Sequence, residues 1–188
     1  MRDTGAGTVG GDERVRLFLA LRLPEDVLGE IQGWQPGALA GAAGVRAVRR
    51  ENLHVTLAFL GHRPAAELET IARSLREAAA GAALPSFAVR GYRETRSVGM
   101  LVLSDEDGHA GALAVDLHER LEALGVYERE QRPWLPHLTV ARFRERPRLC
   151  PALPELGPFS PSDAAVYHSV LRRGGAQYEV VESVPLGG

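Results

Sequence analysis

Residues 53–61 read LHVTLAFLG, and the fold prediction starts from this stretch. Positions 53, 55, 57 and 59 are all apolar, which is typical of a strand with one buried face. Successive side chains of a strand point to opposite faces, so His54 and Thr56 share the other face. An imidazole and a hydroxyl side by side on so apolar a strand indicate that the strand carries part of a functional site.

Residues 136–143 repeat this pattern. They read PHLTVARF, so both stretches contain His-x-Thr followed by an aliphatic residue and an alanine. His54 and His137 are 83 positions apart, each in a half of the chain with one major helix and several strands. A single His-x-Thr occurs by chance in many proteins, so the prediction rests on the pair. We expect two similar lobes related by a pseudo-twofold axis, with the two motif strands opposite each other across a cleft.

Periodicity and turn residues predict the remaining elements. Pro24 and Pro64 open helices, and Gly81 and Gly125 end helices. The order of elements, with hairpins as well as helical crossovers, predicts an α+β fold: a bilobal, mainly antiparallel sheet with helices packed outside and a cleft between the lobes. The expected helices cover residues 24–34, 64–81 and 109–125, and the expected strands cover 15–21, 45–49, 53–61, 86–92, 97–104, 137–143, 163–171 and 176–186, the last two joined by the turn RRGG.

Composition limits the possible classes of protein. The chain has 188 residues, of which 45% are hydrophobic, so we expect one globular domain over residues 14–188. Residues 1–13 are polar and glycine-rich, and we expect a disordered tail there. The net charge of −2 argues against a protein that wraps long duplex DNA. All 22 basic residues are arginine, whose planar guanidinium suits phosphate.

The cysteine count and the hydropathy of the chain indicate its cellular location. Cys150 is the single cysteine, so a disulfide framework within the chain is excluded and a cytoplasmic location is expected. No apolar run approaches the roughly 20 residues of a membrane span. Nothing in the sequence requires more than a monomer.

The paired motifs are suited to phosphodiester chemistry. Two imidazoles near pH 7 can serve as an acid and a base, and two threonine hydroxyls can donate to two oxygens of an anion. One imidazole takes a proton from an attacking water, and the other protonates the leaving oxygen. Such a reaction requires no metal if the leaving group is good or the ester is strained, as a five-membered 2′,3′-cyclic phosphate is, so no metal or other cofactor is expected.

These residues resemble the 2H phosphoesterase superfamily, whose signature is two His-x-Thr/Ser-hydrophobic motifs. Within it, the chain is similar to the bacterial and archaeal RNA 2′,3′-cyclic phosphodiesterases, historically called 2′-5′ RNA ligases. The likeness spans nearly the whole chain. It comprises RLFLALRLPEDV (16–27) for the opening strand and helix, RRENLHVTLAFLG (49–61) and WLPHLTVARF (134–143) for the motifs, and YHSVLRRGGAQYEVV (167–181) for the closing hairpin.

The resemblance implies roles for four residues. His54 would donate a proton to the leaving ribose oxygen and His137 would accept one from water, leaving a 2′-phosphate, while Thr56 and Thr139 hold the phosphate. The sequence gives no independent support for this division of roles, which reverses in the ligation direction. The implied partner is RNA with a 2′,3′-cyclic phosphate end, or a small cyclic nucleotide.

Three further residues are candidates for substrate binding. Arg142 matches the arginine often found after the second motif, although alternation puts it on the face away from His137 unless the strand bulges. Arg49 belongs to an arginine cluster before the first motif, and Trp134 precedes the second and is placed to stack on a base. The arginines near both motifs suggest a positive rim; they are Arg46, Arg49, Arg50, Arg142, Arg144, Arg146, Arg148, Arg172 and Arg173.

Other residue types have simpler interpretations. The histidines His62, His109, His118 and His168 lack metal-ligand spacing, and His118 is expected on a solvated helix face, exposed or hydrogen-bonded. No glycine-rich phosphate loop is present, so ATP-dependent ligation is not supported. The aromatic residues are mostly core candidates; they are Trp34, Phe59, Trp134, Phe143 and Tyr178.

Two alternatives stay open. The same chemistry is compatible with other substrates: 2′-5′-linked oligonucleotides, nucleoside cyclic phosphates or ADP-ribose cyclic phosphate. The rival of another class is a non-catalytic nucleotide- or RNA-binding module in which the motifs only cradle phosphate.

Overall fold

The computed structural model describes residues 13–172 and 175–187. The expected disordered tail, apart from Glu13, therefore lies outside the described residues, as do the middle two residues of the expected turn at 172–175. All strand pairs of the sheet are antiparallel, as predicted, and the sheet order is β4-β5-β6-β3-β1-β7-β8 with β2 beside β6. The strands are β1 (Arg14–Arg22), β2 (Arg46–Ala47), β3 (His54–Pro64), β4 (Phe87–Glu94), β5 (Val98–Asp105), β6 (His137–Arg142), β7 (Asp163–Arg172) and β8 (Gly175–Pro185).

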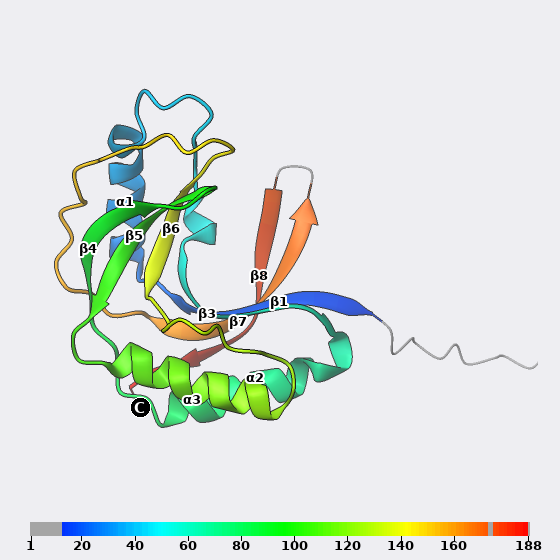
Figure 1. The fold of residues 1–188 in the computed structure, drawn as a ribbon. Coiled ribbons are helices and arrows are strands. Elements are labelled where there is room, and N and C mark those ends of the chain that lie inside the picture. The colour runs from blue at the N-terminus through cyan, green and yellow to red at the C-terminus, as the bar shows by residue number, and fades with distance from the viewer. Residues whose placement is uncertain (1–12, 173–174, 188) are drawn as a thin grey trace, which may run out of the picture.

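The sheet is narrowest where the two motif strands meet. β3 and β6 are joined through one register pair, Val55 with Leu138. On one side of this junction lie β4, β5 and β6, and on the other lie β3, β1, β7 and β8 (Figure 1). The sheet is thus continuous but divided into two halves that curl away from each other, which confirms the predicted bilobal α+β fold.

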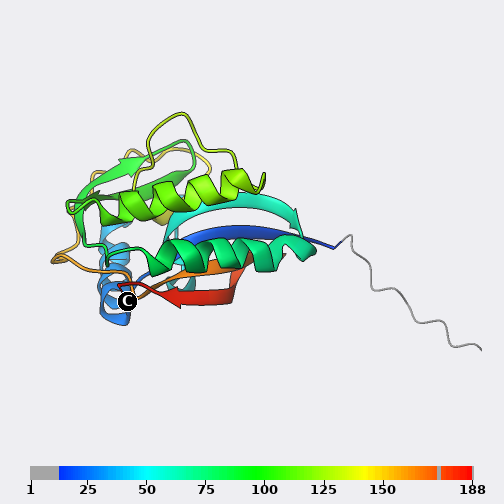
Figure 2. The ribbon, with the colours of Figure 1, turned by 90° about the horizontal axis from the view of Figure 1, so that it is seen from below.

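Over residues 13–172 and 175–187 the structure also contains three α-helices and two short 3-10 helices: α1 (Glu25–Ala38), α2 (Leu68–Ala80), α3 (His109–Ala123), η1 (Arg50–Asn52) and η2 (Ala65–Glu67). α2 and α3 lie side by side below the sheet in Figure 1, and in front of it in Figure 2, which is seen from below. Each follows the predicted amphipathic pattern, with Ile71 and Leu75 of α2 and Leu117 and Leu121 of α3 fully buried. In the part of the chain that the structure describes, no helix combines the length and apolarity that crossing a membrane requires.

Three boundaries differ from the prediction. α1 continues through Pro36 to Ala38, beyond the expected end at residue 34, into the stretch 36–44 that the sequence predicts as a loop or a frayed helix end. Pro64 ends β3 instead of opening a helix, and η2 intervenes before α2 begins at Leu68. The expected strand over residues 45–49 is only two residues long, because the chain turns into η1 directly before the first motif.

The two faces of the sheet have different environments. Leu17, Leu19 and Leu21 of β1 point into the main core, which the helices cover. The intervening Phe18 points to the opposite face, where it packs in a small aromatic cluster with Tyr167. The helix-covered face therefore supplies most of the buried apolar surface, and the other face is left for the functional site.

Candidate active site

The two His-x-Thr motifs lie on neighbouring strands and face the same side of the sheet. In each motif the middle residue, Val55 or Leu138, is buried in the core, so the histidine and threonine point the other way. Extending the register of that central pair by one residue in each direction sets His54 opposite Thr139 and Thr56 opposite His137. The imidazoles are then diagonal neighbours, for which Cα separations are about 7–8 Å. That spacing leaves room for a phosphate between the rings.

Both motif strands contain a bulge directly after the threonine. At Leu57 the register of β3 against β1 shifts by one residue, and at Val140 the register of β6 against β5 does the same. A bulge adds one residue and so reverses the alternation beyond it. As a result Phe59 and Arg142, at the same position of the two motifs, both return to the histidine face.

The bulges change two expectations. Arg142 reaches the cavity beside the motifs, so the alternation that counted against it does not hold past Val140. Phe59 is not a core residue, as the sequence suggested: its side chain is 49% exposed and lines the same cavity, with the Arg16 guanidinium 4.8 Å from its ring centroid.

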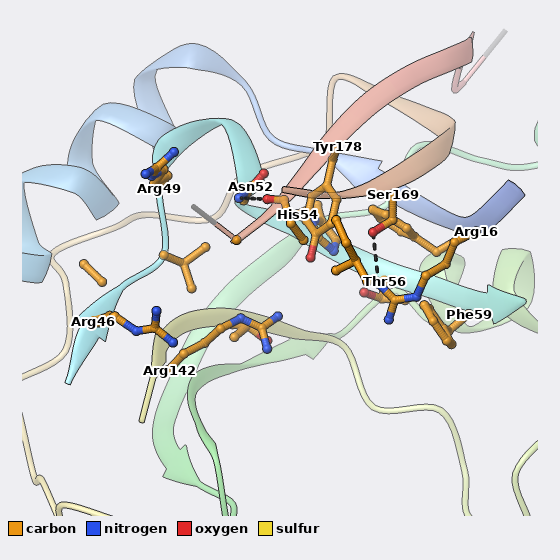
Figure 3. A pocket seen from close by; sticks show the side chains of 17 residues that line it. Arg16, Arg46, Arg49, Asn52, His54, Thr56, Phe59, Arg142, Ser169 and Tyr178 are labelled. Atoms are coloured by element: carbon orange, nitrogen blue, oxygen red, sulfur yellow. Dashed lines mark hydrogen bonds between the residues drawn. The ribbon is translucent and has the colours of Figure 1, made fainter. Parts of the chain in front are cut away.

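The histidine face opens into a cavity of about 790 Å³ (Figure 3). Among the described residues, four arginines line it and no carboxylate does, so the cavity is strongly positive. Arg142 comes from β6, Arg46 and Arg49 from the segment before β3, and Arg16 from β1, where its Nη1 donates to Ser169 Oγ at 3.0 Å. The remaining lining residues are Phe18, Ala47, Val48, Asn52, His54, Thr56, Phe59, Thr139, Ser169, Leu171, Gly175, Ala176 and Tyr178.

His54 is held among aromatic rings. Its ring centroid is 4.9 Å from that of Phe18 and 5.4 Å from that of Tyr178, which meets it edge-on. Burial lowers the pKa of His54 to about 4, and the charges of Arg142 and His137 act in the same direction, while a hydrogen bond to the Asn52 backbone carbonyl opposes them. His54 is therefore neutral in the free protein at pH 7.

The ring of His137 is oriented by the backbone. Its Nδ1 lies 2.8 Å from the Leu135 carbonyl oxygen, and since a carbonyl only accepts, Nδ1 carries the hydrogen. The lone pair of neutral His137 is then on Nε2. His137 is not among the residues that line the cavity, but it shares a face of β6 with the lining residue Thr139, and its charge acts on His54.

Asn52 and Trp134 fix the backbone around the first motif. Asn52 Nδ2 donates to the Ala176 carbonyl of β8 at 3.2 Å, and its Oδ1 is buried without a partner among the described residues. The Trp134 indole nitrogen donates to the Thr56 carbonyl at 3.0 Å. Trp134 is half-buried against the core and does not line the cavity, so nothing in its position supports base stacking.

The arginine rim divides into two groups. Arg46, Arg49 and Arg142 line the cavity, whereas Arg50 pairs with Glu25 and Arg146 pairs with Glu94. Of the other members of the expected rim, Arg144, Arg148 and Arg172 do not line the cavity, and Arg173 lies outside the described residues.

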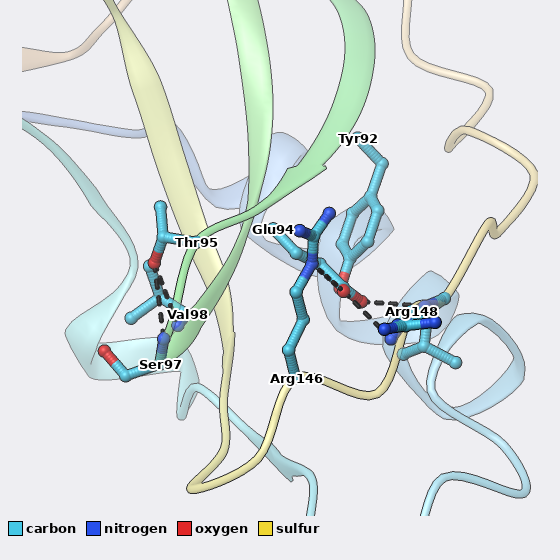
Figure 4. Close-up of polar contacts among 8 residues, drawn as sticks. Tyr92, Glu94, Thr95, Ser97, Val98, Arg146 and Arg148 are labelled. Carbon is cyan, nitrogen blue, oxygen red and sulfur yellow. Dashed lines mark hydrogen bonds and ion pairs between the residues drawn. The ribbon is translucent and has the colours of Figure 1, made fainter.

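Glu94 anchors the segment that follows the second motif (Figure 4). Its side chain is 2% exposed and accepts from the backbone N–H groups of Arg148 and Leu149 at 3.0 and 2.8 Å, and from Arg146 Nε at 3.1 Å. Burial and the nearby Glu94 charge raise the pKa of Tyr92 to about 12. The chain leaving Arg142 is thus tied to β4.

Sequence reasoning missed the contribution of β1 and of the closing hairpin to the cavity. Arg16 and Phe18 alternate with Leu17 and Leu19, so the period of two in β1 already put an arginine and an aromatic residue on the face away from the core. No comparable signal pointed to Ser169. Within the described residues, no three or more His, Cys, Asp or Glu side chains gather as a metal site would require.

The chain is similar to known proteins over most of its length. The chain is 24% identical over 176 residues to the RNA 2′,3′-cyclic phosphodiesterase of Methanocaldococcus jannaschii, which covers 89% of this chain and 99% of that protein. It is 31% identical over 134 residues to the RNA 2′,3′-cyclic phosphodiesterase of Archaeoglobus fulgidus, which covers 70% of this chain and 74% of that protein.

Solved structures share the fold. The crystal structure of TT0787 of Thermus thermophilus superposes with a TM-score of 0.80 at 30% identity, covering 92% of this chain and 98% of that one. Escherichia coli LigT in complex with 3′-AMP gives a TM-score of 0.75 at 23% identity, covering 94% and 100%, which supports the fold alone. The family model described as the 2′-5′ RNA ligase superfamily matches residues 23–176. The chain therefore belongs to the 2′-5′ RNA ligase superfamily, the family of 2H phosphoesterases that its two motifs resemble.

Proposed function

We propose that this protein is a phosphodiesterase that hydrolyses RNA 2′,3′-cyclic phosphate ends to 2′-phosphates without a metal ion. The observation that carries the proposal is the pair of His-x-Thr motifs on neighbouring strands, open to one face beside a cavity that, in the described part of the chain, arginines line and carboxylates do not. The names of the relatives from Methanocaldococcus jannaschii and Archaeoglobus fulgidus support the same substrate.

His137 would act as the base. With Nδ1–H bound to the Leu135 carbonyl, Nε2 is free to take a proton from water as the water oxygen attacks phosphorus. The bond from phosphorus to the 3′ oxygen breaks, and the phosphate remains on the 2′ oxygen. Thr56 and Thr139 would donate to the non-bridging oxygens as negative charge accumulates on them.

His54 would act as the acid. Its lowered pKa means that it must gain a proton when substrate binds, and the phosphodiester anion favours this because it offsets the positive charge of Arg142. One ring N–H stays bound to the Asn52 carbonyl, so the added proton is on the other nitrogen, from which it passes to the 3′ oxygen.

The experiment is hydrolysis of RNA ending in a 2′,3′-cyclic phosphate, measured with excess EDTA. We expect turnover that survives chelation and is lost in His54→Ala and in His137→Ala. His62→Ala is the matched control, because His62 is an exposed histidine of the same strand outside the cavity, and it should retain wild-type activity. Tight binding of the RNA with no turnover by the wild type would instead favour a binding module.

A substrate panel and a pH profile refine the assignment. Faster turnover of 2′-5′-linked oligonucleotides or ADP-ribose cyclic phosphate than of cyclic phosphate ends would assign the same chemistry to another substrate. Acid–base pairing predicts a bell-shaped dependence of kcat/KM on pH, with the acidic limb near the His54 pKa of about 4. A flat profile from pH 5 to 9 would count against the pairing.

A further inference from the structure

Two helical side chains outside the cavity reach the bulges of the motif strands. Gln35 of α1 donates from Nε2 to the Val140 carbonyl at 2.9 Å, and Nε2 of His118 on α3 lies 2.8 Å from the Leu57 carbonyl. Because a carbonyl only accepts, Nε2 of His118 carries the hydrogen. Both side chains are buried, at 3% and 7% exposure, so His118 does not lie on the solvated face that its neighbours in the sequence suggested.

These two residues are equivalent in the internal repeat. Gln35 and His118 are separated by 83 positions, the same offset that separates His54 from His137. This offset also superposes β1 on β5 and α1 on α3, within one or two residues at their ends. The helix of each half donates to the motif strand of the other: Gln35 precedes His54 in the chain but bonds to β6, and His118 precedes His137 but bonds to β3. These two reciprocal hydrogen bonds are therefore related by the same pseudo-twofold axis as the two halves.

The bonded carbonyls belong to the residues that the bulges insert. A bulge leaves its extra residue out of the regular ladder, and a buried carbonyl without a donor is unfavourable. The Val140 carbonyl also accepts from the Val48 N–H at 2.9 Å, so Gln35 adds a second hydrogen bond at that bulge. A donor at Leu57 or Val140 therefore stabilises the bulged strand over a regular one. The bulges in turn bring Phe59 and Arg142 to the cavity.

We propose that Gln35 and His118 are a pair of positioning residues, each of which holds the bulge of the opposite motif and thereby sets the residue that follows it in the cavity. Gln35 sets Arg142, and His118 sets Phe59. Neither touches the cavity, so both act through the backbone. Gln35 also donates to the Val48 carbonyl at 3.0 Å, which ties the strand carrying Arg46 to the same point.

The kinetic test compares loss of each donor with its replacement. Gln35→Met and His118→Leu remove the donor at similar volume, and we expect kcat to fall at least tenfold in each. His118→Gln restores an N–H donor of the kind found at the equivalent position, and should recover most of the activity. Trp34→Phe is the matched control: it removes a donor from the same helix, but one that serves the Ala152 carbonyl outside both motifs, and should leave kcat within about twofold.

The measurement that is specific for positioning is the pKa of His54, determined by an NMR pH titration. The charge of Arg142 lowers the His54 pKa, alongside burial and His137, so Arg142→Gln should raise it. If Gln35 holds Arg142 in place, Gln35→Met raises the His54 pKa by a similar amount, and the double variant gives little further rise. His118→Leu should leave the Arg142 contribution intact. This titration needs no turnover, so it tests the positioning even if the proposed activity fails.

Additive pKa shifts in the double variant would overturn the role of Gln35. Equal loss of kcat in Trp34→Phe and Gln35→Met would also overturn it, because the effect would then be general to α1. Should Gln35→Met fail to fold, the comparison of His118→Leu with His118→Gln decides the matter: equal activities in those two variants would refute the need for a donor at the bulge.

An independent observation concerns the charge of the cavity. Arg46 of β2 is the direct cross-strand partner of Arg142 of β6, and both reach into the cavity with Arg49 (Figure 3). Like charges directly opposite each other destabilise a sheet. None of these three arginines has an ion-pair partner within the described ranges, in contrast to Arg50, which pairs with Glu25. An anion bound between these arginines would offset their mutual repulsion.

The positive charge of the cavity exceeds the negative charge of the reactive phosphate. A cyclic phosphodiester carries one negative charge, whereas Arg16, Arg46, Arg49 and Arg142 together carry four positive charges. We infer that Arg46 and Arg49 form a second phosphate subsite next to the reactive one, so that the preferred ligand carries at least two phosphates, as an RNA end does. This inference rests on the proposed function for the identity of the first phosphate.

The test measures binding without turnover. The dissociation constants of adenosine 2′-phosphate and adenosine 2′,5′-bisphosphate are compared by calorimetry at one ionic strength. We expect the wild type to bind the bisphosphate at least tenfold more tightly, and Arg46→Gln and Arg49→Gln to reduce that ratio towards one. Arg50→Gln, which removes the same charge from a neighbouring position outside the cavity, should keep the ratio.

Two results would overturn the second subsite: a wild-type ratio near one, or an equal drop in Arg50→Gln and Arg46→Gln. If the protein did not hydrolyse the RNA but still bound the bisphosphate more tightly in an Arg46-dependent way, the proposed function would be refuted and the second subsite would be supported.

Discussion

Acid should destabilise this protein partly through His54, whose imidazole stays neutral in the folded state at pH values where the unfolded chain already binds a proton. Burial and neighbouring positive charge lower its pKa from 6.5 to about 4. Between these two values the unfolded state binds more protons than the folded state, so stability falls as the pH falls. The stabilisation is fully present above about pH 6.5 and is lost progressively down to about pH 4.

The size of the effect follows from the two pKa values. One proton bound only by the unfolded state changes the free energy of unfolding by about 1.36 kcal/mol per pH unit. Integrated with pKa values of 6.5 and about 4, the loss between pH 7 and pH 5 is about 2 kcal/mol. With an m-value of about 2–3 kcal/mol/M, this corresponds to roughly 0.7–1 M in the urea midpoint.

The assay is urea unfolding followed by circular dichroism at pH 7 and pH 5, for wild type and His54→Gln. Carboxylates titrate in both proteins, so the difference between their pH dependences isolates His54. The wild type should lose about 2 kcal/mol more than the variant over this interval. His62→Gln, which removes an exposed histidine of the same strand, should behave like wild type. Equal pH dependence in wild type and His54→Gln would refute the desolvation of this imidazole.

Three further substitutions test the surroundings of the site. Thr139→Val should leave the fold intact and slow turnover by about 10²-fold, in line with the loss of one oxyanion donor. Gly99→Ala should lower stability by about 1–3 kcal/mol, since the new Cβ would collide with the Tyr92 hydroxyl, and should cost less in a Tyr92→Ala background, as measured by thermal unfolding. Glu94→Gln weakens the acceptor for the Leu149 N–H, and should accelerate tryptic cleavage within residues 144–149 while cleavage elsewhere is unchanged.

The sequence was sufficient wherever one period of hydrophobicity runs unbroken through an element. The helical spacing of Leu117 and Leu121 identified α3, and the strict alternation around Val55 identified the motif strand and the side on which His54 lies. The offset between the motifs predicted two related halves, because a duplicated lobe must repeat its elements at one spacing. The sequence could not show that these halves share one continuous sheet, since the joining contact is a single residue pair.

The sequence-based predictions fail where the alternation of inward and outward side chains changes within one strand. Phe59 fits an uninterrupted alternation, and only the bulge at Leu57 moves it from the core face to the cavity. Arg142 was doubted for the same reason and is brought to the cavity by the bulge at Val140. The charged neighbours of His118 in the sequence suggested a solvated helix surface. Its hydrogen-bond partner is the Leu57 backbone carbonyl, 61 positions away in the chain, and no local sequence pattern reveals such a contact.

The repeated alanine explains why the bulge occurs at the same place twice. At each bulge two consecutive residues, Leu57 with Ala58 and Val140 with Ala141, are buried in the core. Two adjacent inward side chains cannot both be large, because the space beneath a strand is matched to every second residue. The second residue is alanine in both copies. The six residues His-x-Thr-aliphatic-Ala-x therefore describe a bulged strand: histidine and threonine face the phosphate, the aliphatic residue and alanine fill the core, and the last residue returns to the cavity.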